Sequence, residues 1–381
     1  MSEYQYYEFR AIDRPLTKRE IGELRALSTR AAITSTSFVN TYEWGDFKGD
    51  PDALIVQYFD AFVYLANWGT RRLSLKFPRR LVDEKALSAY CRGESARMRR
   101  VPEFIIVNFW QEDQIPEWEE DDEERMPSLI PLREEVLRGD LRCLYLGWLL
   151  GVQNGEFNDD DAEPMVPRGL AKLSAPLDAF SDFLGIDQDL IAVAAVRSAP
   201  HKAGPVRAHL EAWIKGMPEK EKSALLLQAT RADHPHFQAE LLRQFQQARQ
   251  SSKHNSVQAQ PNRTVGELLA AAEARTAERS RAMAEREASE LARLERDQAA
   301  SRAKYLDQLA TREYEVWDQV TQLVQTKQPN NNDRAVSCLV DLLDLASRRG
   351  REQEFKAALD RLRECHLKKE SFLRRLTKAQ L

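Results

Sequence analysis

The chain has 381 residues, of which 43% are hydrophobic and 30% are charged, and its net charge is −4. This length exceeds the size at which one hydrophobic core keeps growing, so we expect two or three structural units. The small net charge excludes a global attraction to nucleic acid or to an anionic membrane and leaves only local patches for such partners. The longest apolar run, residues 144–152, is about half as long as a membrane span.

The cysteines and the first residues of the chain indicate the cellular compartment. The chain starts without the basic and apolar regions of a secretory signal, so the sequence predicts a cytoplasmic protein. Its cysteines, Cys91, Cys143, Cys338 and Cys365, form no CxxC pair, which argues against a disulfide framework and against a zinc knuckle. We therefore expect no cofactor, no bound metal and no membrane partner.

The first third of the chain has the pattern of alternating strands and helices. Aromatic and β-branched residues favour strands in four segments, 4–12, 37–44, 71–77 and 103–110. Thr17 and Glu20 form a capping box at the start of one helix, and Pro51 opens a second helix over 51–69 that is apolar around most of its circumference. This order predicts an α+β domain over residues 1–126, with a ferredoxin-like arrangement.

Helical periodicity interrupted by Pro and Gly follows, and it predicts a helical domain over residues 127–250. Residues 251–263 are polar and have no periodicity, so we interpret them as a linker.

A long charged helix is predicted over residues 264–328, with a capping box of Thr264 and Glu267 at its start. If continuous, it is a rod on the order of 90 Å long. Alanines and i,i+4 charge pairs such as Arg293 with Asp297 stabilise its middle without burial. This segment is therefore interpreted as a spacer.

An apolar stripe near the end of this helix is the candidate partner-binding site. It comprises Leu306, Leu309, Tyr314, Trp317, Val320 and Val324. Residues 331–381 predict a helical hairpin with Gly350 at its turn, and the stripe is expected either to dock on this hairpin or to pair as a coiled coil in a homodimer. The stretch 273–290 is a poor zipper because it offers alanines and Met283 where large apolar residues are needed.

Two resemblances accompany these patterns. The segments "YQYYEFRAIDRPLT", "FVNTYEWGDFKGDP" and "ANWGTRRL" make the chain similar to an uncharacterised bacterial protein family, and this resemblance implies no activity. The closing segment "EFKAALDRLRECHLKKESFLRRL" resembles the helical tail of bacterial SWIM-type zinc finger proteins. The CxC and CxH zinc ligands of that finger are absent from the sequence, so the similarity implies a helical interaction module without zinc.

The most asymmetric feature of the charge pattern is a basic cluster. Its candidate nucleic-acid-binding residues are Arg71, Arg72, Lys76, Arg79 and Arg80, and arginines continue to residue 100. Alternation puts Arg72 and Lys76 on the strand face opposite Leu73 and Leu75, where they could contact phosphates. The simpler interpretation is a solvated face balanced by the acidic run 117–124, because no RNP-type motif and no Gly-rich phosphate loop accompanies it.

Three further segments have polar or aromatic residues that suit a site. The acidic loop 158–164 lacks the spaced ligands of an EF-hand, so we interpret it as a solvated loop. His234 and His236 suit a helix-entry turn better than a metal or general-base site. The aromatic residues Tyr42, Trp44, Phe47 and Trp68 could stack on bases or on a peptide, although core packing explains them more simply.

The sequence favours a non-enzymatic adaptor or scaffold protein that binds protein partners through the long helix and the C-terminal hairpin. Nucleic-acid binding by residues 71–100 is the first alternative. The second is a metal-dependent hydrolase that uses the carboxylates of residues 158–163. No GxSxG, HExxH, P-loop or GxGxxG motif occurs in the chain.

Overall fold

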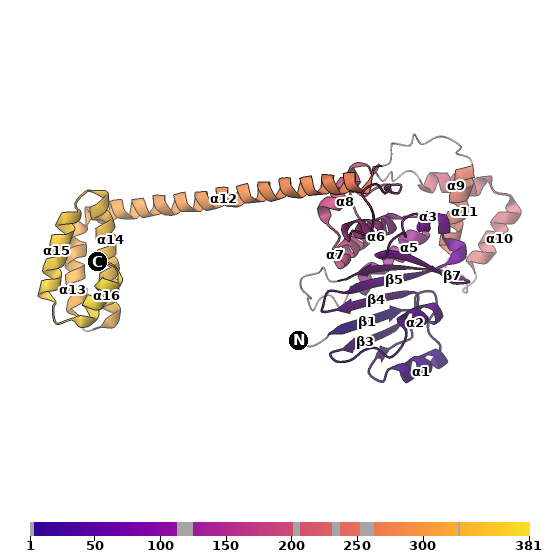
Figure 1. Cartoon of the computed structure of the whole chain (residues 1–381), viewed down its shortest axis with the longest axis horizontal. Helices are drawn as coiled ribbons and strands as arrows, with labels where there is room; N and C mark the ends of the chain where they lie inside the picture. Colours follow the sequence, from indigo (N-terminus) through magenta and orange to yellow (C-terminus); the bar gives the residue numbers. More distant parts are fainter. Residues whose placement is uncertain (1–3, 113–124, 201–205, 231–236, 252–262, 327) are drawn as a thin grey trace. The chain divides into compact units, whose positions relative to one another are not determined.

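The computed structural model describes residues 4–112, 125–200, 206–230, 237–251, 263–326 and 328–381. This part of the chain divides into two compact units, residues 1–278 and residues 279–381, and each has a hydrophobic core of its own. The first unit combines a sheet with helices and the second consists of helices, as Figure 1 shows. The predicted fold class, an α+β region followed by a mostly helical region, is confirmed.

Within the described residues, seven strands form one antiparallel sheet with the spatial order β2-β3-β1-β4-β5-β7-β6. Their bounds are β1 Gln5–Arg10, β2 Ala32–Ile33, β3 Ser37–Tyr42, β4 Ala61–Ala66, β5 Arg71–Pro78, β6 Ala96–Arg100 and β7 Phe104–Gln111. Phe9 of β1 lies opposite Phe38 of β3 and Phe62 of β4. Such cross-strand aromatic pairs stabilise the sheet and fix its register.

The first six elements have a ferredoxin-like arrangement, but two of its strands, β2 and β4, are not among the strands that the sequence predicts. Helix α1 (Lys18–Leu27) connects β1 to β2, and α2 (Pro51–Gln57) connects β3 to β4, which gives the order β-α-β-β-α-β. Both helices pack on one face of the sheet, where Leu24 and Leu54 share a core with Phe9. Strands β5, β7 and β6 continue the sheet beyond β4.

The helix predicted over 51–69 is wrong in its second half. Helix α2 ends at Gln57, and the chain then forms β4 between β1 and β5. Phe62 packs on the face that carries α1 and α2, whereas Val63 and Leu65 pack on the opposite face. A central strand buried on both faces is apolar throughout, so its sequence cannot be distinguished from that of a buried helix by periodicity.

Helices cover the opposite face of the sheet (Figure 1). They are η1 Arg79–Leu81, α3 Glu84–Ser88, α4 Met126–Leu129, α5 Pro131–Leu137, α6 Arg142–Gln153, α7 Ala175–Leu184 and α8 Gln188–Val196. Leu73 of β5 and Trp148 of α6 belong to one core, and the rings of Phe109 and Phe180 lie 4.8 Å apart. The boundary predicted at residue 126 therefore lies inside a shared core.

Three helices follow in the first unit: α9 Val206–Gly216, α10 Glu219–Ala229 and α11 Phe237–Ser251. Pro218 separates α9 from α10. Trp213 of α9 packs against Phe245 of α11 with 5.6 Å between ring centroids.

Helix α12 (Val265–Thr311) contributes residues to both units. Val265 and Leu268 are buried in the core of the first unit, whereas Leu306 and Leu309 are buried in the core of the second. The second unit also contains α13 Glu313–Gln325, α14 Pro329–Arg348, α15 Glu352–Cys365 and α16 Glu370–Lys378. Gly350, with a φ of 67°, makes the predicted turn between α14 and α15.

The charged helix predicted over 264–328 is two helices. It breaks at Arg312, where φ is −127° and ψ is 28°, and α13 begins at the next residue. Because of this break, Val316, Val320 and Val324 pack in the same core as Leu339 of α14.

Candidate interaction sites

The predicted basic cluster does not form one exposed surface. Arg71 is buried and donates a hydrogen bond to the backbone oxygen of Phe183, 3.0 Å away on α7. Arg72 lies on the other face of β5, where its guanidinium pairs with Asp52 and donates to Asn108 Oδ1 at 2.9 Å. The alternation of β5 therefore separates these neighbouring arginines onto opposite faces of the sheet.

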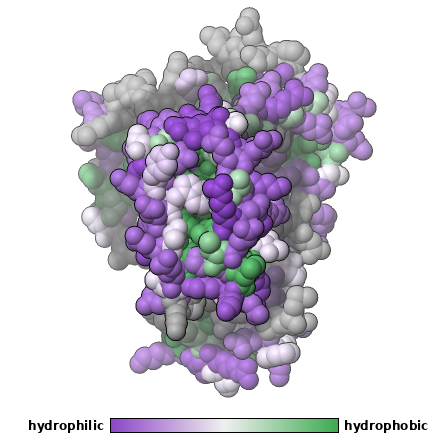
Figure 2. Space-filling view, turned by 90° about the vertical axis from the view of Figure 1, so that its left-hand side faces the viewer, coloured by the Kyte–Doolittle hydropathy of each residue, from purple (hydrophilic) through white to green (hydrophobic). Residues whose placement is uncertain are grey.

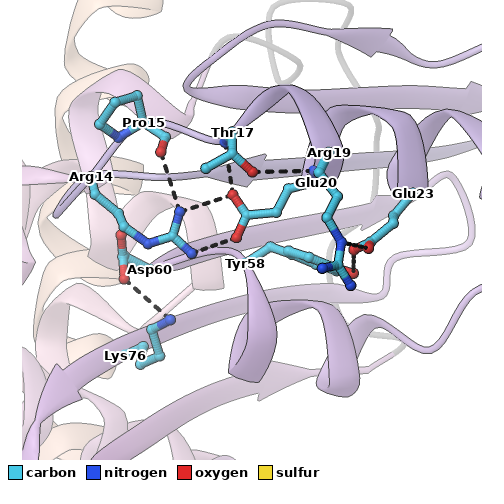
Figure 3. Close-up of polar contacts among 9 residues, drawn as sticks. All are labelled: Arg14, Pro15, Thr17, Arg19, Glu20, Glu23, Tyr58, Asp60 and Lys76. Atoms are coloured by element: carbon cyan, nitrogen blue, oxygen red, sulfur yellow. Dashed lines mark hydrogen bonds and ion pairs between the residues drawn. The ribbon is translucent and has the colours of Figure 1, made fainter.

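Lys76 is buried at 5% exposure, and its Nζ lies 3.3 Å from Asp60 Oδ1 (Figure 3). Asp60 Oδ2 also accepts the backbone N–H groups of Ile12 and Asp13 at 2.7 and 2.9 Å. Burial lowers the pKa of Lys76, and the negative charge of Asp60 opposes that shift. The amine is thus held inside the protein.

The same buried network reaches α5. Arg133 pairs with Asp13 at 2.7 Å and donates through Nε to the backbone oxygen of Lys76 at 2.7 Å. Two cations and two carboxylates therefore balance each other where β4, β5, α5 and the loop after β1 meet.

Arg79 and Arg80 are exposed, but each has an acidic partner. Arg79 lies 3.1 Å from Glu84, and Arg80 lies 3.4 Å from Glu240 of α11. Every one of the five candidate residues is therefore engaged by protein groups, and two of them are buried. Nucleic-acid binding by this cluster stays a prediction, and binding there would require Arg79 and Arg80 to exchange an intramolecular partner for a phosphate.

The acidic loop proposed for a hydrolase site contacts the start of α12. The backbone oxygens of Asp161 and Asp159 accept the N–H groups of Val265 and Gly266 at 2.9 and 3.0 Å. Acceptors and negative charge stabilise the N-terminus of a helix, where N–H groups are unpaired and the dipole is positive. The predicted capping box of Thr264 with Glu267 is present at the same helix end.

A buried ion pair fixes Arg263, two residues before the start of α12. The guanidinium of Arg263 donates to both carboxylate oxygens of Glu163, at 2.7 and 3.0 Å, and Tyr145 donates to the same carboxylate at 2.5 Å. Burial raises the pKa of the Tyr145 phenol well above its ordinary value. Further along α12, Arg275 and Thr276 donate hydrogen bonds to the carboxylate of Asp189 on α8.

A second set of contacts holds the other end of α12. Arg302 pairs with Asp341 and Asp344 of α14, and Tyr305 donates to Asp341 at 2.7 Å. Arg348 donates to the backbone oxygen of Ala303 at 3.0 Å. The last turns of α12 are thus bound to α14 by charge as well as by apolar packing.

The predicted partner-binding stripe is largely occupied within its own unit. Leu306, Leu309, Val320 and Val324 are buried, and Trp317 is half-buried against Phe355, 5.7 Å between ring centroids. Docking on the C-terminal helices is therefore confirmed, and a homodimer could not use these buried residues without opening the core. Tyr314 differs because it is 90% exposed.

The four aromatic residues near the turns of the sheet divide into two pairs. Phe47 is buried and Tyr42 packs against its core, so the interpretation as core residues is confirmed for them. Trp44 and Trp68 are exposed by 74% and 44%, so that interpretation is wrong for them. Their loops flank β1, since Gln5 donates to Asp46 and the N–H of Asn67 donates to the backbone oxygen of Tyr4.

Several other candidates lie outside the described residues, namely His234, His236 and the acidic run 117–124. Among the residues that are described, no group of three or more His, Cys, Asp and Glu side chains is placed to hold a metal ion. Within the same ranges, every helix is too short or too polar to cross a membrane.

Sequence reasoning missed the Arg263–Glu163–Tyr145 cluster. Its residues are separated by up to about one-third of the chain, and each type is common, so no local spacing indicated it. The one local feature that points to this cluster is the arginine directly before the capping box of α12.

Comparisons of the chain with protein-family models, with curated proteins and with solved structures find no match.

Proposed function

We propose that the protein is a non-enzymatic adaptor that binds protein partners. One observation carries this proposal: a single helix, α12, supplies buried residues to two separate cores, while its middle is exposed. From residue 277 to residue 301 almost every side chain is exposed, and the larger apolar residues there, Met283, Leu291 and Leu294, are exposed by more than half.

The charge pattern of this middle segment supports a connecting role. Arg293 pairs with Asp297 along the helix, 3.9 Å apart, and alanines supply helix propensity where no core is available. A helix that stays folded without burial can join two binding units without contributing a binding surface of its own.

The outer surface of the C-terminal unit supports protein binding. In Figure 2, which views the face that α13 and α15 form in Figure 1, a narrow hydrophobic strip runs between hydrophilic side chains. Tyr314 is the second residue of α13, next to Glu313, whose carboxylate accepts a hydrogen bond from Arg351 at 2.7 Å. Exposed tyrosines on rigid elements are frequent energetic centres of protein interfaces.

The test is affinity purification of the tagged full chain, with and without nuclease, followed by binding assays between the purified protein and each protein recovered. The adaptor proposal requires a partner that survives nuclease, binds the purified chain and is lost when residues 302–381 are deleted. Tyr314→Ala should weaken that binding at least about tenfold, as loss of an interface centre does. Tyr314→Phe serves as the matched control and should retain it.

A second arm tests the connection. Replacing residues 281–300 by a Gly/Ser sequence of equal length should leave each unit folded but impair function that needs both units. A scrambled sequence of the same 20 residues should preserve it. If no recovered protein binds the purified chain directly, the adaptor proposal is wrong.

A further inference from the structure

The last helical hairpin has a concentration of positive charge. Residues 361–378 contain seven lysines and arginines and two glutamates. They comprise the end of α15, the turn after it and α16, a stretch in which nine helical residues span only about 14 Å. The cations of α16 are therefore close together in space as well as in sequence.

Three of the seven cations have partners inside the unit. Arg363 lies 3.3 Å from Asp360, and Arg375 lies 2.5 Å from Asp333 of α14. Lys369 donates to the backbone oxygen of Thr326 at 3.2 Å.

The other four, Arg361, Lys368, Arg374 and Lys378, are exposed and make no ion pair or hydrogen bond within the described residues. Their arrangement follows from the packing of α16. Phe372 and Leu376 are buried in the core of the unit, which puts Arg374 and Lys378, one helical turn apart, on the outward side. This hairpin therefore presents positive charge that the protein itself does not neutralise, unlike the predicted cluster on the sheet.

We propose that the hairpin formed by α15 and α16 binds the phosphate backbone of a nucleic-acid duplex without reading its sequence. Unpaired, exposed lysines and arginines release counterions when they meet closely spaced phosphates, and this contact needs neither a groove nor a base-specific residue. The proposal is independent of the adaptor role and adds a second kind of partner.

The packing disfavours other anionic partners. Phe372 and Leu376 of α16 are buried and Leu373 is partly buried, which leaves Leu367 of the preceding turn as the one large apolar residue of this segment that is exposed. The segment therefore has no continuous apolar face to insert into a membrane surface. Phe372 is fully buried and cannot stack on the unpaired bases of a single strand, and the other ring of the segment, His366, is half-buried in the turn. A duplex has the higher charge density and needs only the exposed cations.

The experiment is fluorescence anisotropy of the full chain with a labelled mixed-sequence duplex of about 24 base pairs and, separately, with a single strand of equal length. A duplex of this length is longer than the hairpin. Four phosphate contacts predict a slope of about −3.6 in log K against log salt, which is about a 150-fold loss of affinity between 50 and 200 mM salt. The variant Arg361→Gln, Lys368→Gln, Arg374→Gln, Lys378→Gln should abolish this salt-dependent binding. Arg374→Gln with Lys378→Gln alone should remove about half of the slope.

The matched control removes four exposed arginines that have acidic partners in the first unit: Arg79→Gln, Arg80→Gln, Arg97→Gln and Arg99→Gln. It changes the net charge equally and should retain duplex binding. Circular dichroism melts establish that each variant is folded.

Three outcomes would overturn the proposal. One is the absence of duplex binding at 50 mM salt. Another is loss of duplex binding in the control variant but not in the hairpin variants, which would mean that the binding site lies on the arginines of the first unit. The third is equal displacement by poly-glutamate, or binding to vesicles with anionic lipids at the same affinity, which would assign the patch to acidic proteins or to membranes.

Discussion

The two units of this protein handle charge in opposite ways. The first buries ionised groups in its interior, including Lys76 with Asp60 and Arg263 with Glu163. Among the described residues of the second unit, the core is apolar and its ion pairs, such as Arg302 with Asp341, lie at the surface. A buried pair is costly to desolvate and costlier still to break, whereas a surface pair contributes little.

This difference indicates what each unit depends on. The buried pairs of the first unit join residues far apart in sequence, so its fold depends on a few non-local polar contacts being made together. The second unit is built from consecutive helices whose apolar faces meet. Its stability should therefore depend more on the volume of its buried side chains than on its ion pairs.

The largest effect is expected from Arg263→Met, which leaves Glu163 buried with Tyr145 as its remaining partner. The free energy of unfolding of the first unit should fall by about 3–5 kcal/mol, measured by urea denaturation. Combining Arg263→Met with Glu163→Leu should recover much of the loss, because no charge is then left buried. A loss below about 1 kcal/mol in the single variant would show that the pair is not important to the fold.

A cavity in the second unit should have the next largest effect. Leu339→Ala, in the centre of α14, should lower the free energy of unfolding of that unit by about 2–5 kcal/mol. Hydrogen exchange should then increase over residues 302–381 and stay unchanged in the sheet. Leu294→Ala, at an exposed position of α12, is the control and should have little effect. Loss of protection in the sheet would show that the two cores are not independent.

A smaller effect is expected at the capping box of α1, shown in Figure 3. Hydrogen bonds from Arg14 and from the backbone N–H of Thr17 lower the pKa of Glu20 to about 2. Because the folded pKa lies below the ordinary value, this contribution to stability is complete above about pH 4.5 and is lost as the pH falls toward 2.

Glu20→Gln should therefore reduce the stability of the first unit at pH 7 and have a weaker effect near pH 2, measured as the melting temperature across this range. An equal effect at both pH values would mean that the charge of Glu20 is not what stabilises the cap.

The smallest effect is expected in the middle of α12. Arg293→Ala removes a single exposed pair with Asp297, and it should change helix stability by no more than about 0.5 kcal/mol. Ala288→Gly, on the same stretch, should cost about 1 kcal/mol because it raises the entropy of the unfolded backbone. The difference is measurable by the circular dichroism of a peptide covering residues 278–301. A larger effect of Arg293→Ala would indicate that the segment relies on its charges more than on alanine.

Features that depend on neighbouring residues were predictable from the sequence. The capping boxes at Thr17 and Thr264 and the turn at Gly350 are where the sequence placed them, because each involves residues within one or two turns of one another. Strand β4 was not, since its burial on both faces removes the alternation that distinguishes a strand.

The sites were harder to predict than the fold for the same reason. The basic residues on β5 and η1 can be found in the sequence. Their partners Asp60, Glu240 and the backbone oxygen of Phe183 come from other parts of the chain. Conversely, no pattern in the sequence distinguishes Arg374 and Lys378 from the cations around them. Only the packing shows that their neighbours Arg363 and Arg375 are paired and that they are not.

The exposed middle of α12 has a consequence for how this protein can change over generations. Its side chains contact almost nothing beyond the helix itself, so substitution there is constrained by helix propensity and solubility and not by the identity of any partner residue. We expect the sequences of relatives to diverge fastest between residues 279 and 301 while remaining free of proline. The residues on either side of that stretch, which enter the two cores, should be retained.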